Sequence, residues 1–332
     1  SRPQTARMSS NGKFTAAAAQ LSPRLGDVAA NLELHGKSIA EARGRGADLV
    51  VFPELSLTGY LLRDMVPTVA LRLESPELKQ LRKLSQKIAI VVGLVEETRS
   101  FRFHNSAVFL DRGELVAVHR KVYLPTYGMF DEQRYFAQGS EIRAFDCRFG
   151  RGAMLICEDL WHPSTAYLAA LDDALWIVCP SASPLRGISD GQEQDDNARY
   201  WELINRFYAA TFSLSLVYAN RVGFEDGIGF WGGSEILDAG GERIAKARYY
   251  EPDLVVAEIQ PKVARRSRVA APLLRDEDLD LTINELIRIR GRLTKLEGRT
   301  EKVSPAPDAT RRPLPKGERR RPFPRPVRGS RR

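Results

Sequence analysis

Apolar runs and helix-patterned stretches alternate along most of the chain. Short apolar runs predict buried strands, at residues 14–21, 48–52, 88–95, 106–110, 115–119, 153–157, 175–179, 214–219, 226–237 and 254–259. Apolar residues at three- and four-residue spacings predict helices, from residue 28 to an end near 44–46 and at residues 75–87, 163–171, 197–212 and 279–296. This alternation, with some hairpin-like strand pairs, indicates a layered α/β architecture.

One large domain and a basic tail are the simplest division of the 332 residues. No internal repeat or long linker interrupts residues 13–298, so we expect that segment to fold as one α/β domain. Residues 299–332 hold 12 Lys and Arg against three acidic residues, together with seven of the 19 prolines. Because so few of its residues are apolar, this tail cannot build a core, and we expect it to be disordered.

The formal charge of +8 belongs to the tail, since residues 1–298 sum to about −1. The arginines from Arg311 to Arg332 could bind nucleic acid or an acidic protein by neutralising phosphates or carboxylates. Phe323 is the only aromatic residue among these charges, which favours a solvated extension instead. Nucleic-acid binding is therefore expected, at most, through the tail.

Cysteine, histidine and apolar content exclude several classes of protein. The three cysteines Cys147, Cys157 and Cys179 are too few for a disulfide framework and indicate a reducing compartment. The four histidines lack metal-ligand spacing, so we expect neither a metal nor a cofactor. The first 13 residues lack a secretory signal, and no apolar run approaches the roughly 20 residues that span a bilayer. A soluble, cytoplasmic protein is expected.

Three predicted strand ends each carry one polar residue that could serve catalysis. Glu54, Lys121 and Cys157 each follow or end an apolar run, and such strand ends are where sites form in α/β sheets. A cysteine followed by Glu158 and Asp159 needs a nearby cation to ionise. Lys121 could supply that cation while Glu54 takes the thiol proton. From the residues alone, a role for Cys157 as a small buried apolar residue stays open.

Three motifs, by their order and spacing, resemble those of the nitrilase-like carbon-nitrogen hydrolases. They are Phe52–Leu55, His119–Lys121 and Ile156–Trp161, with further matches at Leu57–Tyr60 and Asn220–Gly223. The resemblance covers residues 14 to about 260 and implies the family's αββα sandwich, which usually forms a homodimer or a higher homo-oligomer through its helices. Periodicity by itself supports only the layered α/β class.

By this resemblance, catalysis depends on four side chains. Glu54 is the general base, Lys121 stabilises the tetrahedral intermediate, and Cys157 forms a thioester with the acyl group. Glu132 matches the family's additional carboxylate, which positions the lysine and the substrate. The implied activity is hydrolysis of a small non-peptide amide, with release of ammonia or an amine.

Residues 124–136 and 157–161 resemble the glutaminase domain of glutamine-dependent NAD synthetases. In that branch Tyr127 and Glu158 would hold the glutamine head group, and Ser183 would line the same pocket. Tyr60, at the end of the Leu57–Tyr60 match, is also expected to contact the substrate.

Other features weaken the case for glutamine. No Lys or Arg stands at Ile188 or Ser189, where that branch often places one, although Arg186 or Arg199 could replace it. The segment Phe230–Ser234 instead resembles stand-alone amidases and carbamoylases.

The expected function is therefore that of a free-standing amidase. No phosphate loop of the SGGxDS type is present, so NAD synthesis by this chain alone is not expected. Family members that act on nitriles often carry Trp directly after the cysteine, where this chain has Glu158. A glutamine amidase that supplies ammonia for NAD synthesis, an N-carbamoyl hydrolase, a nitrilase and a non-catalytic scaffold remain as alternatives.

Overall fold

The computed structural model describes residues 12–185 and 196–300. The chain divides into two compact units, residues 1–276 and residues 277–332, and each is described by itself. Within its described residues, the first unit contains two six-stranded sheets and one two-stranded sheet. The predicted tail lies outside the described residues from position 301 onward. The arginines from Arg311 to Arg332, considered for binding nucleic acid or an acidic protein, therefore lie outside them too.

The first sheet joins the two ends of the first unit. Its strands, in spatial order, are β14 (Asp253–Ile259), β1 (Phe14–Gln20), β2 (Leu49–Val51), β3 (Ala89–Glu97), β4 (Phe103–Asp111) and β5 (Glu114–Arg120). β1, β2 and β3 are parallel, whereas β14, β4 and β5 run antiparallel to their neighbours. Nearly continuous apolar runs suit the central strands because both faces of the sheet are covered.

The second sheet has the same mixed character. Its strands, in spatial order, are β13 (Arg243–Lys246), β12 (Glu235–Leu237), β9 (Ser215–Asn220), β8 (Trp176–Ser181), β7 (Gly150–Met154) and β6 (Ala144–Cys147). β7, β8 and β9 are parallel, and the outer strands are antiparallel to their neighbours.

The prediction of a single strand at 226–237 is wrong. The segment forms β11 (Ile228–Trp231), which pairs with β10 (Val222–Glu225) in the two-stranded sheet, and then β12 in the second sheet. Gly232 and Gly233 separate the two strands, with φ angles of 73° and 60°. Such left-handed backbone is open to glycine and breaks a continuous strand.

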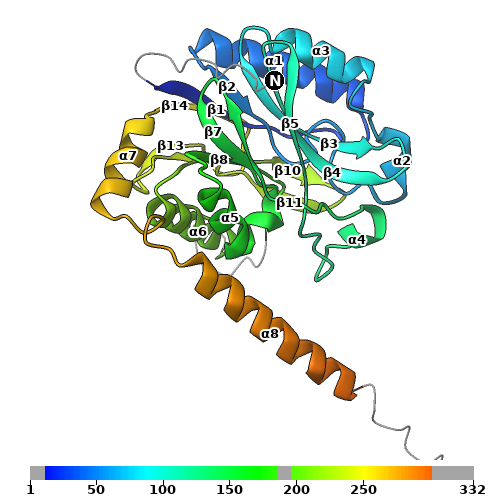
Figure 1. Ribbon diagram of the computed structural model, residues 1–332. Helices are drawn as coiled ribbons and strands as arrows, with labels where there is room; N and C mark the ends of the chain where they lie inside the picture. The colour runs from blue at the N-terminus through cyan, green and yellow to red at the C-terminus, as the bar shows by residue number, and fades with distance from the viewer. Residues whose placement is uncertain (1–11, 186–195, 301–332) are drawn as a thin grey trace, which may run out of the picture. The chain divides into compact units, whose positions relative to one another are not determined.

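Helices cover the outer faces of both sheets (Figure 1). α1 (Val28–Gly44) and α3 (Pro76–Leu84) pack on the first sheet, and α5 (Pro163–Leu171) and α6 (Asp196–Phe212) pack on the second. The remaining helices of this unit are η1 (Arg63–Met65), α2 (Val66–Val69), α4 (Glu132–Tyr135), η2 (Cys157–Trp161) and α7 (Pro261–Ala270). The second unit contains α8 (Leu279–Thr300).

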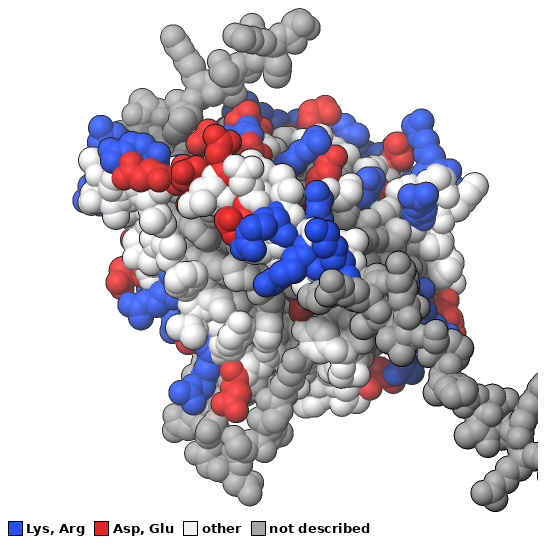
Figure 2. Space-filling model, turned by 60° about the horizontal axis from the view of Figure 1, so that its bottom comes forward, with Lys and Arg blue, Asp and Glu red and all other residues white. Residues whose placement is uncertain are grey.

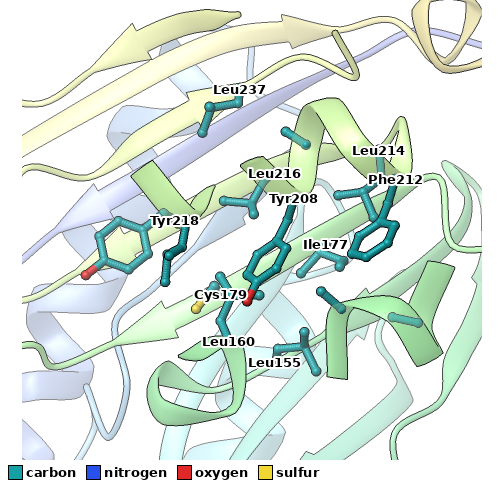
Figure 3. Packing of buried hydrophobic residues seen from close by; sticks show 14 of the residues in the cluster. Leu155, Leu160, Ile177, Cys179, Tyr208, Phe212, Leu214, Leu216, Tyr218 and Leu237 are labelled. Carbon is teal, nitrogen blue, oxygen red and sulfur yellow. The ribbon is translucent and has the colours of Figure 1, made fainter. Parts of the chain in front are cut away.

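Alternate residues of each strand face opposite layers, which produces the sandwich. In β1, Ala16 and Ala18 face the core between the sheets, where they meet residues of the second sheet such as Val178, while Ala17 and Ala19 face the helices. On the outer side of the second sheet, Tyr208 of α6 packs over Ile177 and Leu216 (Figure 3). The predicted αββα sandwich is therefore confirmed.

Charges of both signs occur on the molecular surface. On the face that Figure 2 shows, acidic and basic side chains are both present, several of them side by side. Exposed ion pairs of the first unit include Arg63–Asp226 at 3.1 Å and Arg248–Glu251 at 2.9 Å. Such pairs contribute little to stability because water screens them.

Candidate active site

Glu54, Lys121 and Cys157 stand in loops that begin where three strands end. Glu54 lies three residues after β2, Lys121 directly follows β5, and Cys157 is the first residue of η2. The strand predicted to reach Cys157 ends at Met154 instead. Cys157 has a left-handed φ of 44°, which a strand does not accommodate. The sharp bend turns its side chain out of the strand's alternating pattern.

A glycine in β3 lets the loop that carries Glu54 lie directly against the first sheet. A Cβ on Gly93 would come within 2.4 Å of the backbone nitrogen of Leu55 and 2.6 Å of the carbonyl oxygen of Pro53. Real Cβ contacts are never that short, so a side chain at position 93 would push the loop away. The position of Glu54 therefore depends on Gly93.

Lys121 is the centre of a buried charge cluster. Its Nζ donates to Oε1 of Glu54 and to Oε1 of Glu132, each at 2.7 Å, and its side chain is fully buried. Glu54 also accepts hydrogen bonds from Asn105 Nδ2 at 2.8 Å and from the backbone N–H of Ala182 at 2.9 Å. Two carboxylates thus share one ammonium group inside the protein.

Burial and neighbouring charges shift the pKa values of this cluster in opposite directions. Burial lowers the pKa of Lys121, but the carboxylates of Glu132 and Glu54 outweigh it and hold that pKa well above its usual range. Burial raises the pKa of Glu132 to about 7; Lys121 opposes this rise, and Glu54 adds to it. Lys121 is therefore charged at neutral pH, whereas Glu132 titrates near neutrality.

Tyr60 links the charge cluster to a second buried ion pair. Its hydroxyl donates to Oε1 of Glu132 at 2.5 Å. The backbone N–H groups of Tyr60 and Leu61 donate to Oε1 of Glu225, at 2.8 and 2.6 Å. The other oxygen of Glu225 accepts from Nη1 of Arg221 at 2.6 Å. The Arg221–Glu225 pair therefore anchors the loop from which Tyr60 reaches Glu132.

The surroundings of Cys157 favour the protonated thiol. Burial raises the pKa of the Cys157 thiol well above its usual range; Glu54 raises it further, and Lys121 lowers it. Ser181 Oγ donates to Sγ at 3.4 Å and accepts from the Tyr218 hydroxyl at 3.2 Å. A thiol in this state must give up its proton before it can attack a carbon atom.

The carboxylate of Asp159 joins the loop after β5 to the loop after β7. Its Oδ1 accepts the N–H groups of Val122 and Tyr123, each at 2.9 Å. Its Oδ2 accepts the N–H of Ile156 at 3.0 Å and lies 2.8 Å from His119 Nε2. Because Asp159 is fully buried, these bonds are protected from water and hold the two loops in a fixed relation.

Asn105 and Asp159 were not predicted from the sequence to have a role in the site. Asn105 is a polar residue inside the buried strand β4, and Asp159 stands within the Ile156–Trp161 motif. Asn105 stands between His104 and Ser106, and Asp159 follows Glu158, so neither interrupts an apolar run and no local pattern singled them out.

Two of the residues predicted to contact substrate lie beside each other. The Tyr127 hydroxyl donates to the carboxylate of Glu158, at 2.9 Å from Oε1 and 3.0 Å from Oε2. Tyr127 is 45% exposed, whereas Tyr60 is buried. Glu158 directly follows Cys157, so this contact adds a carboxylate and an aromatic ring next to the cysteine.

Ser183, the fourth residue of that prediction, is buried in the loop after β8. Its Oγ accepts from Asn197 Nδ2 and from Trp201 Nε1, each at 2.8 Å. These two donors on α6 fix the loop that carries Ala182.

Arg186 and Arg199 were considered as replacements for the Lys or Arg that the glutaminase branch often has at the positions of Ile188 or Ser189. Arg186, Ile188 and Ser189 lie outside the described residues. Arg199 is on the exposed side of α6, and its Nη1 lies 4.0 Å from the Asp196 carboxylate.

A cavity of about 330 Å³ is lined by Tyr60 and Glu132 but not by Glu54, Lys121 or Cys157. Charged side chains of Arg63, Asp131 and Arg134 also line it. Apolar and aromatic residues form much of its wall: Leu62, Val66, Phe130, Tyr135 and Phe136. Oε2 of Glu132 is buried and has no hydrogen-bond partner in the described structure. A buried carboxylate oxygen without a partner is suited to accept an N–H donor.

Two kinds of feature are absent from the described residues, 12–185 and 196–300. Neither range contains a group of three or more His, Cys, Asp and Glu residues that could hold a metal ion. None of the helices in those ranges is long and apolar enough to cross a membrane.

Comparison with known sequences places the matched region across most of the first unit. The sequence profile of a family described as carbon-nitrogen hydrolase matches residues 15–269. A glutamine-dependent NAD(+) synthetase from Thermotoga maritima is 32% identical over 248 residues, which are 73% of this chain and 41% of that protein. The chain thus spans less than half the length of this relative.

Two solved structures share the fold over nearly their whole length. A carbon-nitrogen hydrolase from Helicobacter pylori G27 has a TM-score of 0.71 and 26% identity, covering 82% of this chain and 98% of that one. A mutant amidase from Nesterenkonia sp. AN1 carries the acetamide moiety of fluoroacetamide covalently on its active-site cysteine. Its TM-score is 0.68 at 25% identity, covering 85% of this chain and 98% of that one.

Proposed function

The chain belongs to the carbon-nitrogen hydrolase family, and on that premise we propose that it hydrolyses a small primary amide through a thioester on Cys157. The observation that carries the proposal is the buried Lys121 ammonium, held between Glu54 and Glu132 at 2.7 Å. The charges of Lys121 and Glu54 both act on the Cys157 thiol. A nucleophile, a base and a fixed cation are the parts that acyl transfer needs.

The first half of the proposed reaction forms the thioester. Glu54 takes the proton of the Cys157 thiol, and the sulfur attacks the amide carbon. The negative charge that develops on the carbonyl oxygen is stabilised by Lys121 and by the backbone N–H that follows Cys157. Glu54 then gives its proton to the amide nitrogen, the C–N bond breaks, and ammonia leaves.

The second half regenerates the enzyme. Glu54 takes a proton from a water molecule, whose oxygen attacks the thioester carbon. The C–S bond breaks, the carboxylic acid leaves, and the proton returns to the sulfur. Lys121 keeps its charge throughout, because the two carboxylates hold its pKa well above the usual range. In this scheme Glu132 acts by positioning Lys121, with Tyr60 holding Glu132 in turn.

The cavity beside Glu132 supports a small substrate. At about 330 Å³, with aromatic and charged residues both in its wall, it suits a short acyl chain or an amide head group. The partnerless Oε2 of Glu132 is suited to accept one N–H of a primary amide. A nitrile offers no such donor, which favours amides over nitriles.

Glutamine is the second candidate substrate, favoured by the contact between Tyr127 and Glu158. A carboxylate directly after Cys157 would attract the ammonium group of an amino acid. The Thermotoga maritima relative is named as glutamine-dependent, which supports the same choice. In this case the chain would release ammonia for another enzyme, and a cytoplasmic location would suit that role.

Ammonia release from parallel substrates tests the proposal. The purified chain is incubated with L-glutamine, a short aliphatic amide, an N-carbamoyl amino acid and a nitrile. We expect release from the aliphatic amide or glutamine, and loss of release in Cys157→Ala. Cys147→Ala is the matched control, because Cys147 is half-buried and lies outside the charge cluster.

Intact-mass measurement separates the mechanism from the substrate. Under acid quench, wild-type protein with a turned-over amide should carry the mass of the acyl group, and Cys157→Ala should not. Turnover of an amide that persists in Cys157→Ala would overturn the proposal. Turnover of the carbamoyl compound or the nitrile alone would show that the substrate belongs to that class instead. The proposed role of the Cys157 thiol would not change.

A further inference from the structure

α8 carries a regular apolar stripe. The residues Leu279, Thr282, Leu286, Ile289 and Leu293 follow one another at spacings of three and four. This is the spacing of the a and d positions of a coiled coil, which lie on one side of a helix. Gly291 falls outside the stripe, on the opposite side of the helix.

Three of the five stripe residues are exposed in the described structure, and Thr282 and Ile289 are half-buried. Leu279 and Leu293 are each 47% exposed, and Leu286 is 61% exposed. Ile283 and Ile287, which flank the stripe, are more than half exposed as well. A helix of this length with a glycine in its middle is marginal in water by itself, because helices owe most of their stability to a packed apolar face. We therefore expect another apolar surface to cover the stripe.

The charges of this helical region are divided by sign. Residues 277–287 contain four acidic and no basic side chains, whereas residues 288–299 contain five basic and one acidic. Interaction with the helix dipole reaches only the first and last turns, so it does not account for Glu285 or Arg292 in the middle turns. A partner that fits this pattern must present positive charge to the first half and negative charge to the second.

We infer that α8 pairs with α8 of a second copy of this chain, in antiparallel orientation. The same helix turned end for end supplies both the apolar stripe and the complementary charges. In the a–d register, Leu286 packs against Ile289 of the second copy and Thr282 against Leu293 of the second copy. Glu285, which contacts Arg288 in its own helix, then lies near Arg292 of the second copy.

The tail provides an independent reason for this orientation. Residues 299–332 carry 12 basic and three acidic side chains. A parallel pair would begin both of these positive segments at the same end of the coiled coil, where like charges repel. An antiparallel pair begins them at opposite ends.

Sedimentation of the full chain over a range of concentrations tests the pairing. Leu286→Glu places a charge in the stripe. The weight-average molar mass should therefore fall by a factor of two relative to wild type. Leu281→Glu is the matched control: Leu281 is 60% exposed on the same helix but lies off the stripe, so its variant should sediment like wild type. Equal masses for wild type and Leu286→Glu, or an equal fall in the control, would overturn the inference.

A charge exchange tests the orientation. Glu285→Arg alone and Arg292→Glu alone should each weaken association, by about tenfold in the dissociation constant, and the double variant should restore it. In a parallel pair Glu285 would face Arg290 of the second copy, and the double variant would not recover. Hydrogen exchange adds a last discriminator, because a monomeric chain with a protected α8 would show that the helix docks on its own chain instead.

Discussion

The cluster around Lys121 and the pair of Arg221 with Glu225 are both buried, but they differ in charge balance. Arg221 faces one carboxylate, whose two oxygens are taken up by the guanidinium and by two backbone N–H groups. Nε and Nη2 of Arg221 are buried without a hydrogen-bond partner in the described structure, and the guanidinium lies 4.2 Å from the ring centre of Phe230. Lys121 faces two carboxylates, and one oxygen of Glu132 has no partner beside the cavity.

The comparison shows how a buried charge can serve structure in one place and chemistry in another. Burying an ion costs free energy, and a counter-ion of opposite charge offsets part of that cost. An excess carboxylate is not compensated, so its pKa rises, as that of Glu132 does, to about 7. Groups with such shifted pKa values are typical of functional sites. We therefore expect changes at Lys121 to remove activity and changes at Arg221 to remove stability.

The largest expected effect is on activity, at Lys121. Lys121→Met keeps the length of the side chain but removes the cation proposed to stabilise the intermediate. Steady-state ammonia release should fall at least about 10³-fold, the cost of losing one strong oxyanion donor. Circular dichroism should show a folded protein, since Glu132, whose pKa is already about 7, can take up a proton once the ammonium is gone. Residual turnover above one part in about 100 would contradict this role.

The next effect is on stability, at Arg221. Arg221→Met leaves the carboxylate of Glu225 buried without its counter-ion, which should lower the free energy of unfolding by about 3–5 kcal/mol. Urea unfolding measures this change. The turnover number per folded molecule should stay within a few-fold of wild type. A large fall in turnover with unchanged stability would instead place Arg221 in the catalytic machinery.

The smallest effect is expected at Tyr60, which connects the two regions. Tyr60→Phe removes a hydrogen bond to a carboxylate worth about 1.5–3 kcal/mol, so kcat/KM should fall about 10- to 100-fold. The hydroxyl lowers the pKa of Glu132, and its loss should raise that pKa from about 7. If Glu132 acts as the carboxylate, activity disappears as pH falls through this pKa. The acid limb of the pH–rate profile should therefore move to higher pH.

Tyr135→Phe is the control for this experiment, because Tyr135 lines the same cavity. Its pH–rate profile should match that of wild type. An acid limb that does not move in Tyr60→Phe would show that Glu132 does not control it.

Local patterns were sufficient to predict the layered architecture and the three strand ends that carry candidate catalytic residues. The runs before Glu54, Lys121 and Cys157 are apolar over several residues, and such runs form buried strands wherever they are covered on both faces. The motifs around them then suggested which polar residues belong together. Glu132, in a different loop, was reached only through the resemblance, and the structure places it 2.7 Å from Lys121.

Other features depend on contacts between distant segments and could not be predicted from local patterns. The left-handed φ of Cys157 ends its strand early, a conformation that surrounding structure must impose on a non-glycine residue. Asp159 accepts the N–H groups of Val122 and Tyr123, which lie 37 and 36 residues earlier in the sequence. Glu225 holds the backbone of Tyr60 across 165 residues. No periodicity encodes such pairings.

The pairing of β1 with β14 has a consequence for how the protein is made. Phe14 lies opposite Ile259, so β1 leaves the ribosome long before β14, the strand that completes this side of its sheet. Until then, one edge of β1 is open to other chains, and a sheet edge of this kind promotes aggregation. At about 5–20 residues per second, synthesis of the intervening segment takes tens of seconds. A chaperone that shields β1 during translation would raise the yield of active protein, and stop codons placed before β14 should give insoluble chains.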